Sequence, residues 1–115
     1  MIFSLSLLRQ RVEYLHLEVI KNNMIGMGLS GWMADFGEWL PLDAVLYSGV
    51  NPKIYHNEYP VVWAKLNREA VEETNNQGNI VFFNRSGFTY SNKYATLFWL
   101  GDQMVDWKPN DGLAS

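Results

Sequence analysis

Apolar residues near the start of the chain recur at alternating spacings of three and four, which is the period of one helix face. The pattern predicts a helix from about residue 4 to residue 25, which Gly26 and Gly28 would end. Its apolar face would comprise Leu5, Leu8, Val12, Leu15 and Val19.

A second helix is predicted after a turn-rich stretch at 41–58, which we expect to be an elaborated loop. Glu58, Tyr59 and Pro60 would open this helix, because proline is well placed in a first helical turn. Gly78 would close it. Its inner face would comprise Val62, Leu66 and Ala70.

Three apolar runs alternate with these helices and are expected to be strands, at residues 29–36, 79–87 and 95–103. The first follows glycine and suits a strand that is buried on both faces. The second is rich in β-branched and aromatic residues, as buried strands are. Residues 107–115 are expected to be a loop that enters a helix, with Asp111 as its N-cap.

This order of elements is typical of a parallel α/β architecture. Three parallel strands form neither a closed barrel nor a complete doubly wound sheet. The chain is therefore expected to be a piece of a larger fold.

The composition narrows the possible partners. The chain has 115 residues, of which 48% are hydrophobic and 18% charged, which suits one globular domain. A net charge of −3 provides no basic face for nucleic acid, and no cysteine is present for disulfides or thiolate metal sites. No apolar run approaches the roughly 20 residues of a membrane span, and the N-terminus lacks the basic region of a signal peptide. Compartment and oligomeric state stay open.

Aromatic residues make up 15% of the chain, with tryptophan at 32, 39, 63, 99 and 107. So many rings suit either a dense core or a pocket for sugars, whose C–H faces pack on aromatic rings. Core packing is the commoner of the two.

The candidate chemistry lies where the predicted strands end, at Asp35, Arg85 and Asp102. In parallel α/β folds, functional side chains gather at the carboxyl ends of strands. Two carboxylates that face one cavity suit glycoside cleavage by a nucleophile and a general acid/base. They suit metal binding less, because only His16 and His56 are available and a structural role is the better interpretation of both. We therefore expect no metal and no cofactor.

Two segments carry a resemblance to a known family. "GWMADFGEWLP" at 31–41 and "RSGFTYSNKYATLFWLGDQMVDW" at 85–107 resemble the nucleophile and acid/base segments of glycoside hydrolase family 31, the retaining α-glucosidase family. The likeness is to its sulfoquinovosidase-like and bacterial α-glucosidase-like branch. It implies a fragment of a (β/α)8 TIM barrel, about strands 4 to 6 with their intervening helices. Residues 1–18 would be an N-terminal helix whose first part lies outside the resemblance, and residues 19–115 a partial catalytic barrel.

The resemblance also implies roles for individual residues. The nucleophile segment falls on Trp32, Asp35 and Glu38, which makes Asp35 the expected nucleophile, and Asp102 falls on the acid/base position. Arg85 would bind sugar hydroxyls or keep a catalytic carboxylate ionised. Trp32 and Trp99 are candidate platforms for the sugar, with barrel packing as an equal alternative. Glu38 is expected to orient a neighbour rather than to catalyse.

The sequence departs from the family pattern at two positions. Gly37 stands where many members have Asn, a change that looks like the sulfoquinovosidase-like branch, and Met104 replaces a more usual polar residue. An apolar surround of Phe98, Trp99 and Trp107 is expected to favour the protonated form of Asp102.

Three functions stay open at this point. The first is a retaining exo-α-glycosidase acting on a small-molecule α-glucoside or α-sulfoquinovoside. The second is a truncated remnant that is inactive or only binds sugar. The third is an interaction module whose carboxylates merely cap helices and pair with cations, which would place Asp35 and Asp102 at opposite ends of the sheet.

Overall fold

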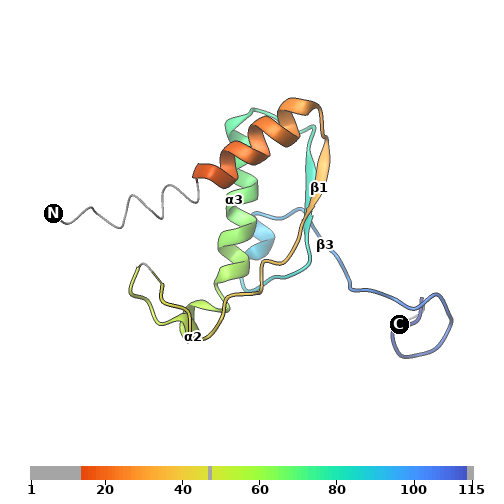
Figure 1. Ribbon diagram of the computed structural model, residues 1–115. Helices are drawn as coiled ribbons and strands as arrows, with labels where there is room; N and C mark the ends of the chain where they lie inside the picture. Colours follow the sequence, from red (N-terminus) through yellow and green to blue (C-terminus); the bar gives the residue numbers. More distant parts are fainter. Residues whose placement is uncertain (1–13, 47, 114–115) are drawn as a thin grey trace.

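The computed structural model describes residues 14–46 and 48–113, which form a three-stranded parallel sheet with helices packed along it (Figure 1). The strands are β1 (Gly31–Ala34), β2 (Val81–Asn84) and β3 (Leu97–Phe98), in the order β1-β2-β3. Both pairings are parallel, which confirms the predicted α/β architecture. The strands are shorter than predicted, and β1 stops early because Phe36 adopts a φ of 59°, which turns the chain out of the sheet.

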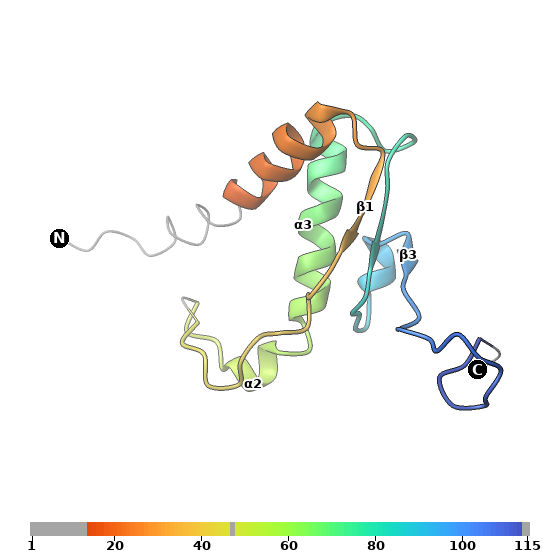
Figure 2. The same cartoon turned by 45° about the vertical axis from the view of Figure 1, so that its right-hand side comes forward.

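The helix α3 (Tyr59–Glu73) lies along the sheet in both views (Figure 1, Figure 2). It begins where the prediction placed it but ends before Gly78. Asn75 takes the left-handed conformation with a φ of 56°, a conformation that asparagine tolerates well. The hydroxyl of Thr74 donates to the carbonyl of Ala70 and satisfies one of the free carbonyls at the helix end.

The described part of the first predicted helix runs from residue 14 to residue 27, while residues 4–13 lie outside the described residues. It is α-helical over 14–18, π-helical over η1 (Val19–Met24) and 3-10 helical over η2 (Ile25–Met27). Gly28 ends it at a φ of 93°, as predicted, because glycine adopts this conformation without strain.

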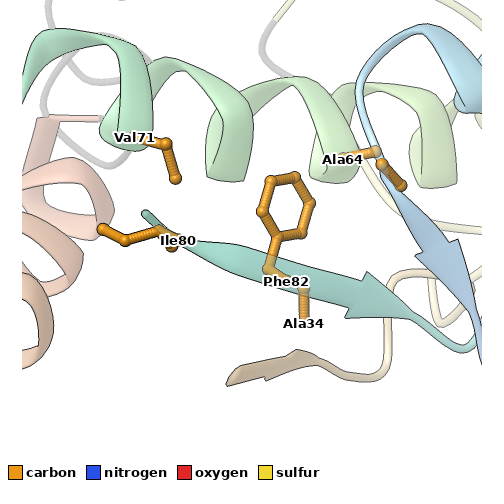
Figure 3. Packing of buried hydrophobic residues seen from close by; sticks show 6 residues of the cluster. Ala34, Ala64, Val71, Ile80 and Phe82 are labelled. Atoms are coloured by element: carbon orange, nitrogen blue, oxygen red, sulfur yellow. The ribbon is translucent and has the colours of Figure 1, made fainter. Parts of the chain in front are cut away.

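The core lies between α3 and one face of the sheet (Figure 3). Phe82 is fully buried, and Trp32 stacks on it with ring centroids 5.8 Å apart. The indole N–H of Trp32 donates to Asn67 of α3 at 2.8 Å, so the alternate residues 32 and 34 of β1 face the helix. The core cluster comprises Ala34, Ala64, Val71, Ile80, Phe82 and Ala95.

Two further predictions about burial have mixed outcomes. On α3, Leu66 and Ala70 are buried as expected, whereas Val62 is only half-buried. The expectation that the first strand is buried on both faces is wrong, because Ala34 is its only buried residue. The helices within the described residues pack on one face, which leaves Val81 of the neighbouring strand 46% exposed.

The loop at 41–58 contains one helical turn, α2 (Pro52–Tyr55), which the sequence analysis did not predict. The side chain of Asn51 caps it by accepting the backbone N–H of Lys53. The Nδ1–H of His56 donates to the carbonyl of Leu40 at 2.7 Å and ties the loop to the segment after β1. This contact agrees with the structural role expected of His56.

The segment after β3 runs away from the sheet in both views (Figure 1, Figure 2). The expected N-cap at Asp111 is wrong for this structure, because Asp111 has a φ of 55° and no helix follows up to residue 113. A bridge between Met104 and Gly112 closes the segment into a loop instead. Residues 114 and 115 lie outside the described residues.

Candidate active site

The three predicted polar groups follow the carboxyl ends of the three strands. Asp35 comes directly after β1, Arg85 directly after β2, and Asp102 four residues after the end of β3. The register aligns Ala34 with Asn84 and Asn84 with Phe98, so the three strands end at the same edge of the sheet. This arrangement argues against the interaction-module alternative, which needed the two aspartates at opposite ends.

Arg85 is the centre of the site. Its Nε donates to Oε1 of Glu38 at 2.8 Å, and its Nη2 contacts the same oxygen. The Nε also lies 3.3 Å from Oδ1 of Asp35. Glu38, rather than Asp35, is therefore the main partner of the arginine, which the sequence did not reveal.

The electrostatics of Arg85 bring in the third carboxylate. Its pKa is raised above the ordinary value by the hydrogen bond to Glu38, against the opposing effect of burial, and further by the charges of Asp35, Glu38 and Asp102. Asp102 therefore lies within electrostatic reach of the guanidinium. The side chains of Asp35, Glu38, Arg85 and Asp102 form one charged group, which we call the edge cluster.

Glu38 is held in its ionised form. Burial of its side chain opposes ionisation, but hydrogen bonds from Arg85 and from the indole N–H of Trp39 outweigh it, so the pKa of Glu38 lies below its ordinary value of 4.5. All three donors converge on Oε1, while Oε2 is buried without a hydrogen-bond partner among the described residues.

We expect Glu38→Gln to weaken the dependence of the free energy of unfolding on pH in the acidic range. Because folding lowers the pKa of Glu38, its ionised form stabilises the fold fully above pH 4.5, and this stabilisation is lost as the pH falls through the lowered value. Urea unfolding between about pH 3 and pH 7 should show a wild-type advantage over Glu38→Gln that narrows below pH 4.5. The narrowing will be modest, since water screens a side chain that is 35% exposed.

The matched control for this measurement is Glu72→Gln, an exposed position on α3. Its stability difference from wild type should stay flat over the same range. A Glu38→Gln difference that is equally flat would show that the pairing with Arg85 does not stabilise the fold.

Asp35 is positioned by its own neighbour. Its Oδ1 accepts the backbone N–H of Phe36 at 2.9 Å, in addition to the contact with Arg85. The side chain remains 33% exposed, so it is accessible to a ligand at the edge of the sheet.

The space around Gly37 is too small for a side chain. A Cβ at this position would lie 2.5 Å from the ring of Trp63 and 2.9 Å from the hydroxyl of Ser86. An asparagine, as in many family members, would therefore collide with both unless they moved. The departure noted in the sequence is thus explained by the close approach of α3 and the segment after β2 to this backbone.

The surroundings of Asp102 are more open than expected. Trp99 extends the pairing beyond β3, because its backbone N–H donates to the carbonyl of Asn84 at 2.9 Å. Beyond it, Gly101 turns the chain at a φ of 104°, and Asp102 is exposed. Trp107 is 80% exposed, so the apolar surround predicted for Asp102 is not assembled among the described residues.

The candidate platform Trp32 lies away from the edge cluster. Its indole faces α3 and packs on Phe82, whereas Asp35 and Arg85 occupy the opposite parity of their strands. This favours packing, the alternative that the sequence left open for Trp32.

His16, the other histidine considered in the sequence, packs against Trp63 in a T-shaped arrangement, with ring centroids 5.7 Å apart.

Within 14–46 and 48–113, no three side chains of the metal-ligating types gather as a metal site. No helix in this part of the chain is long and apolar enough to cross a membrane.

Polar side chains that gather at the carboxyl edge of a parallel sheet are typical of the functional sites of α/β enzymes, barrels among them. Comparison with known proteins identifies the family. The family model of the glycosyl hydrolases family 31 TIM-barrel domain matches residues 6–111. The chain belongs to this family, and the family resemblance seen in the sequence is confirmed.

Particular relatives narrow the likeness further. The chain is 59% identical over 98 residues to the sulfoquinovosidase of Escherichia coli (strain K12), a match that covers 85% of the chain and 14% of that protein. It is 48% identical over 98 residues to the sulfoquinovosidase of Agrobacterium fabrum, covering 85% of the chain and 15% of that protein.

A solved structure gives the same result. A family 31 sulfoquinovosidase from E. rectale, in complex with the aza-sugar inhibitor IFGSQ, superposes with a TM-score of 0.86 and 48% identity. The match covers 96% of the chain and 16% of that structure. The chain thus spans only 14 to 16% of the length of the relatives that it matches.

Proposed function

We propose that the edge cluster belongs to the active site of a retaining exo-α-glycosidase whose substrate is a small-molecule α-sulfoquinovoside. The observation that carries this proposal is the pairing of Asp35 and Glu38 with the guanidinium of Arg85 at the carboxyl edge of the sheet, the edge at which Asp102 follows β3 within electrostatic reach of Arg85. The sulfoquinovosidase relatives favour the sulfoquinovoside over the α-glucoside among the two substrates that the sequence left open.

In this proposal Asp35 is the nucleophile. Its carboxylate, which is 33% exposed, attacks the anomeric carbon, and the Nε of Arg85 lies beside it at 3.3 Å. Asp102 protonates the departing oxygen and then deprotonates the water that hydrolyses the glycosyl-enzyme. Two displacements retain the anomeric configuration, and they need the two carboxyl groups about 5 to 5.5 Å apart in the complete barrel.

Arg85 is proposed to bind sugar hydroxyls rather than the sulfonate. Asp35 and Glu38 pair with this one cation and Asp102 lies within its electrostatic reach, so the edge cluster carries net negative charge and would repel a sulfonate. We therefore place the sulfonate site outside the described residues. Trp99, which follows β3 at the same edge, remains the candidate platform beside the sugar.

The strands β1, β2 and β3 are proposed to be the fourth, fifth and sixth strands of a (β/α)8 barrel. The two carboxylate segments follow its fourth and sixth strands under this numbering, as the family resemblance implies. Residues 19–115 would then be the segment of the catalytic barrel. Residues 1–18 would be an N-terminal helix that comes before this segment.

A second candidate function is that the isolated chain is an inactive or sugar-binding remnant. The segment after β3 favours it, because Leu100, Val105 and Trp107 are 80% or more exposed there and have no core to enter within the described residues.

A chimera tests the proposed function. The 98 aligned residues of the E. coli sulfoquinovosidase are replaced by those of this chain, and release of nitrophenol from nitrophenyl α-sulfoquinovoside and nitrophenyl α-glucoside is compared. We expect hydrolysis of the sulfoquinovoside with an α-configured first product by NMR, since the barrel around the edge cluster is then complete. A folded chimera that hydrolyses neither compound would refute the proposal.

The 115-residue chain by itself is assayed in parallel, with calorimetric titration against sulfoquinovose. Sugar binding without hydrolysis by this chain, together with an inactive chimera, would establish the remnant instead.

A further inference from the structure

Phe36 has an unusual conformation beside the proposed nucleophile. Its φ of 59° lies in the left-handed region, which is an outlier for a bulky residue, and its side chain is 58% exposed. Glycine and asparagine are the residues that tolerate this conformation, but the residue here is phenylalanine. Strained backbone of this kind persists where the surroundings hold it and clusters at functional sites.

The strained conformation places two groups of Phe36 on the edge cluster. Its backbone N–H donates to Oδ1 of Asp35 at 2.9 Å. Its ring lies under the guanidinium of Arg85, with the Cζ atom 4.2 Å from the ring centroid, which is a cation–π contact. Trp39 packs against the same ring in a T-shaped arrangement, with centroids 6.2 Å apart and planes at 73°.

Different neighbours contact different parts of the Arg85 guanidinium. Glu38 takes the edge formed by Nε and Nη2, and Phe36 covers one face. Nη1 lies outside these contacts. An arginine held on one edge and one face cannot rotate freely, so its remaining donors point in a fixed direction.

We propose that Phe36 is a positioning residue that fixes Asp35 and Arg85 relative to each other. This inference rests on the proposed function, because the geometry it protects is that of the attacking carboxylate and of the arginine that binds the sugar. Without the ring, Arg85 can turn toward Glu38 alone, and the carboxylate of Asp35 loses its fixed cation. The strain at Phe36 is thus tied to the alignment of the reacting group.

Three substitutions in the E. coli chimera test the proposal. Phe36→Leu retains an apolar side chain but removes the π face. Phe36→Gly removes the ring and also relieves the backbone strain, because glycine adopts this φ freely. Phe36→Tyr keeps the ring and serves as the conservative rescue.

We expect Phe36→Leu and Phe36→Gly to lower kcat by about 10- to 100-fold, the loss that follows a misplacement of about 1 Å at a reacting group. Phe36→Tyr should recover most of that loss. Phe36→Gly should lose activity while its thermal unfolding midpoint stays unchanged or rises. A residue that merely stabilised the fold would not separate activity from stability in this way.

Tyr90 provides the matched control. It also has a left-handed φ, of 78°, an exposed ring, and a cation over that ring, the Nζ of Lys93 at 4.5 Å. Unlike Phe36, it makes no hydrogen bond, ion pair or cation–π contact with the edge cluster within the described residues. Tyr90→Leu should therefore leave kcat unchanged. Wild-type kcat in both Phe36→Leu and Phe36→Gly, in an active chimera, would overturn the inference.

Crystal structures of the chimera and its Phe36→Leu variant give a readout that does not depend on activity. The Arg85 Nε to Asp35 Oδ1 distance, 3.3 Å here, should lengthen beyond contact in the variant. An unchanged distance would overturn the positioning role even if the chimera were inactive. An inactive chimera in which the distance does lengthen would refute the proposed function alone.

Discussion

Asp35→Asn in the chimera is expected to lower kcat for sulfoquinovoside hydrolysis by about 10³-fold or more, because the amide cannot form the glycosyl-enzyme bond. The substitution keeps the size of the side chain and leaves an oxygen that can accept the N–H of Phe36, so the fold should survive. Initial rates with the nitrophenyl glycoside, together with the thermal unfolding midpoint, measure both effects.

Azide distinguishes a lost nucleophile from general damage at Asp35. In Asp35→Ala the small anion can enter the space of the carboxylate and attack the anomeric carbon directly, which gives a β-configured glycosyl azide after a single displacement. Asp43→Asn, at an exposed position in the long loop, is the matched carboxylate control and should retain wild-type turnover. Undiminished hydrolysis by Asp35→Asn would remove Asp35 from its assigned role.

Asp102→Asn is expected to lower hydrolysis by about 10²- to 10⁴-fold for a glycoside with an alkyl leaving group, which needs protonation as it departs. The loss in the first step should be far smaller for nitrophenyl glycosides, whose leaving group departs without a proton. The second step still lacks its base, so a burst of nitrophenol followed by slow turnover is expected in stopped-flow measurements.

Azide again identifies the step that is lost at Asp102. It should accelerate turnover of Asp102→Ala and give the α-configured glycosyl azide, because the covalent intermediate on Asp35 still forms. Asp111→Asn is the control, since asparagine tolerates the left-handed φ of 55° at that exposed position. Equal losses for alkyl and nitrophenyl glycosides in Asp102→Asn would contradict an acid/base role.

Together the two aspartates should therefore give azides of opposite configuration. This contrast does not depend on the size of either rate loss. It tests the division of roles between nucleophile and acid/base directly.

Much of the architecture could be predicted from the sequence, because it depends on local patterns. Pro60 in a first turn and Gly28 with its left-handed φ mark helix boundaries that the structure confirms. The end of α3 was misplaced because Asn75, rather than Gly78, takes the left-handed position, and the two residue types are both suited to it. The length of β1 was overestimated because nothing in the sequence shows that Phe36 leaves the sheet.

The sequence predicted which polar residues lie at the candidate site but not which of them contact one another. Asp35, Arg85 and Asp102 were found because polar residues at the ends of apolar runs are visible in one dimension, and the structure brings them to one edge. Glu38 was assigned an orienting role, but its pairing with Arg85 could not be read from the chain, because it joins residues 47 positions apart.

The aromatic residues show the same limit. Trp32 and Phe36 lie four positions apart in one aromatic segment, yet one packs under α3 and the other covers the guanidinium of Arg85. Their strand parity is the same and would place both rings on one face of the sheet, but the left-handed φ of Phe36 turns its ring away, and that conformation is not visible in composition.

The order of helices and strands, the acidic and arginine side chains at the strand ends, and the family can be inferred from the sequence alone, since they follow from short-range pattern and from residue identity. The three-dimensional structure was needed to show which carboxylate holds Arg85, why a side chain at position 37 would crowd its neighbours, and which aromatic ring faces the charges. Those outcomes depend on how α3 and the segments after β1 and β2 approach one another in space. Contacts of that kind are set by packing and electrostatics between distant residues, which no local period along the chain encodes.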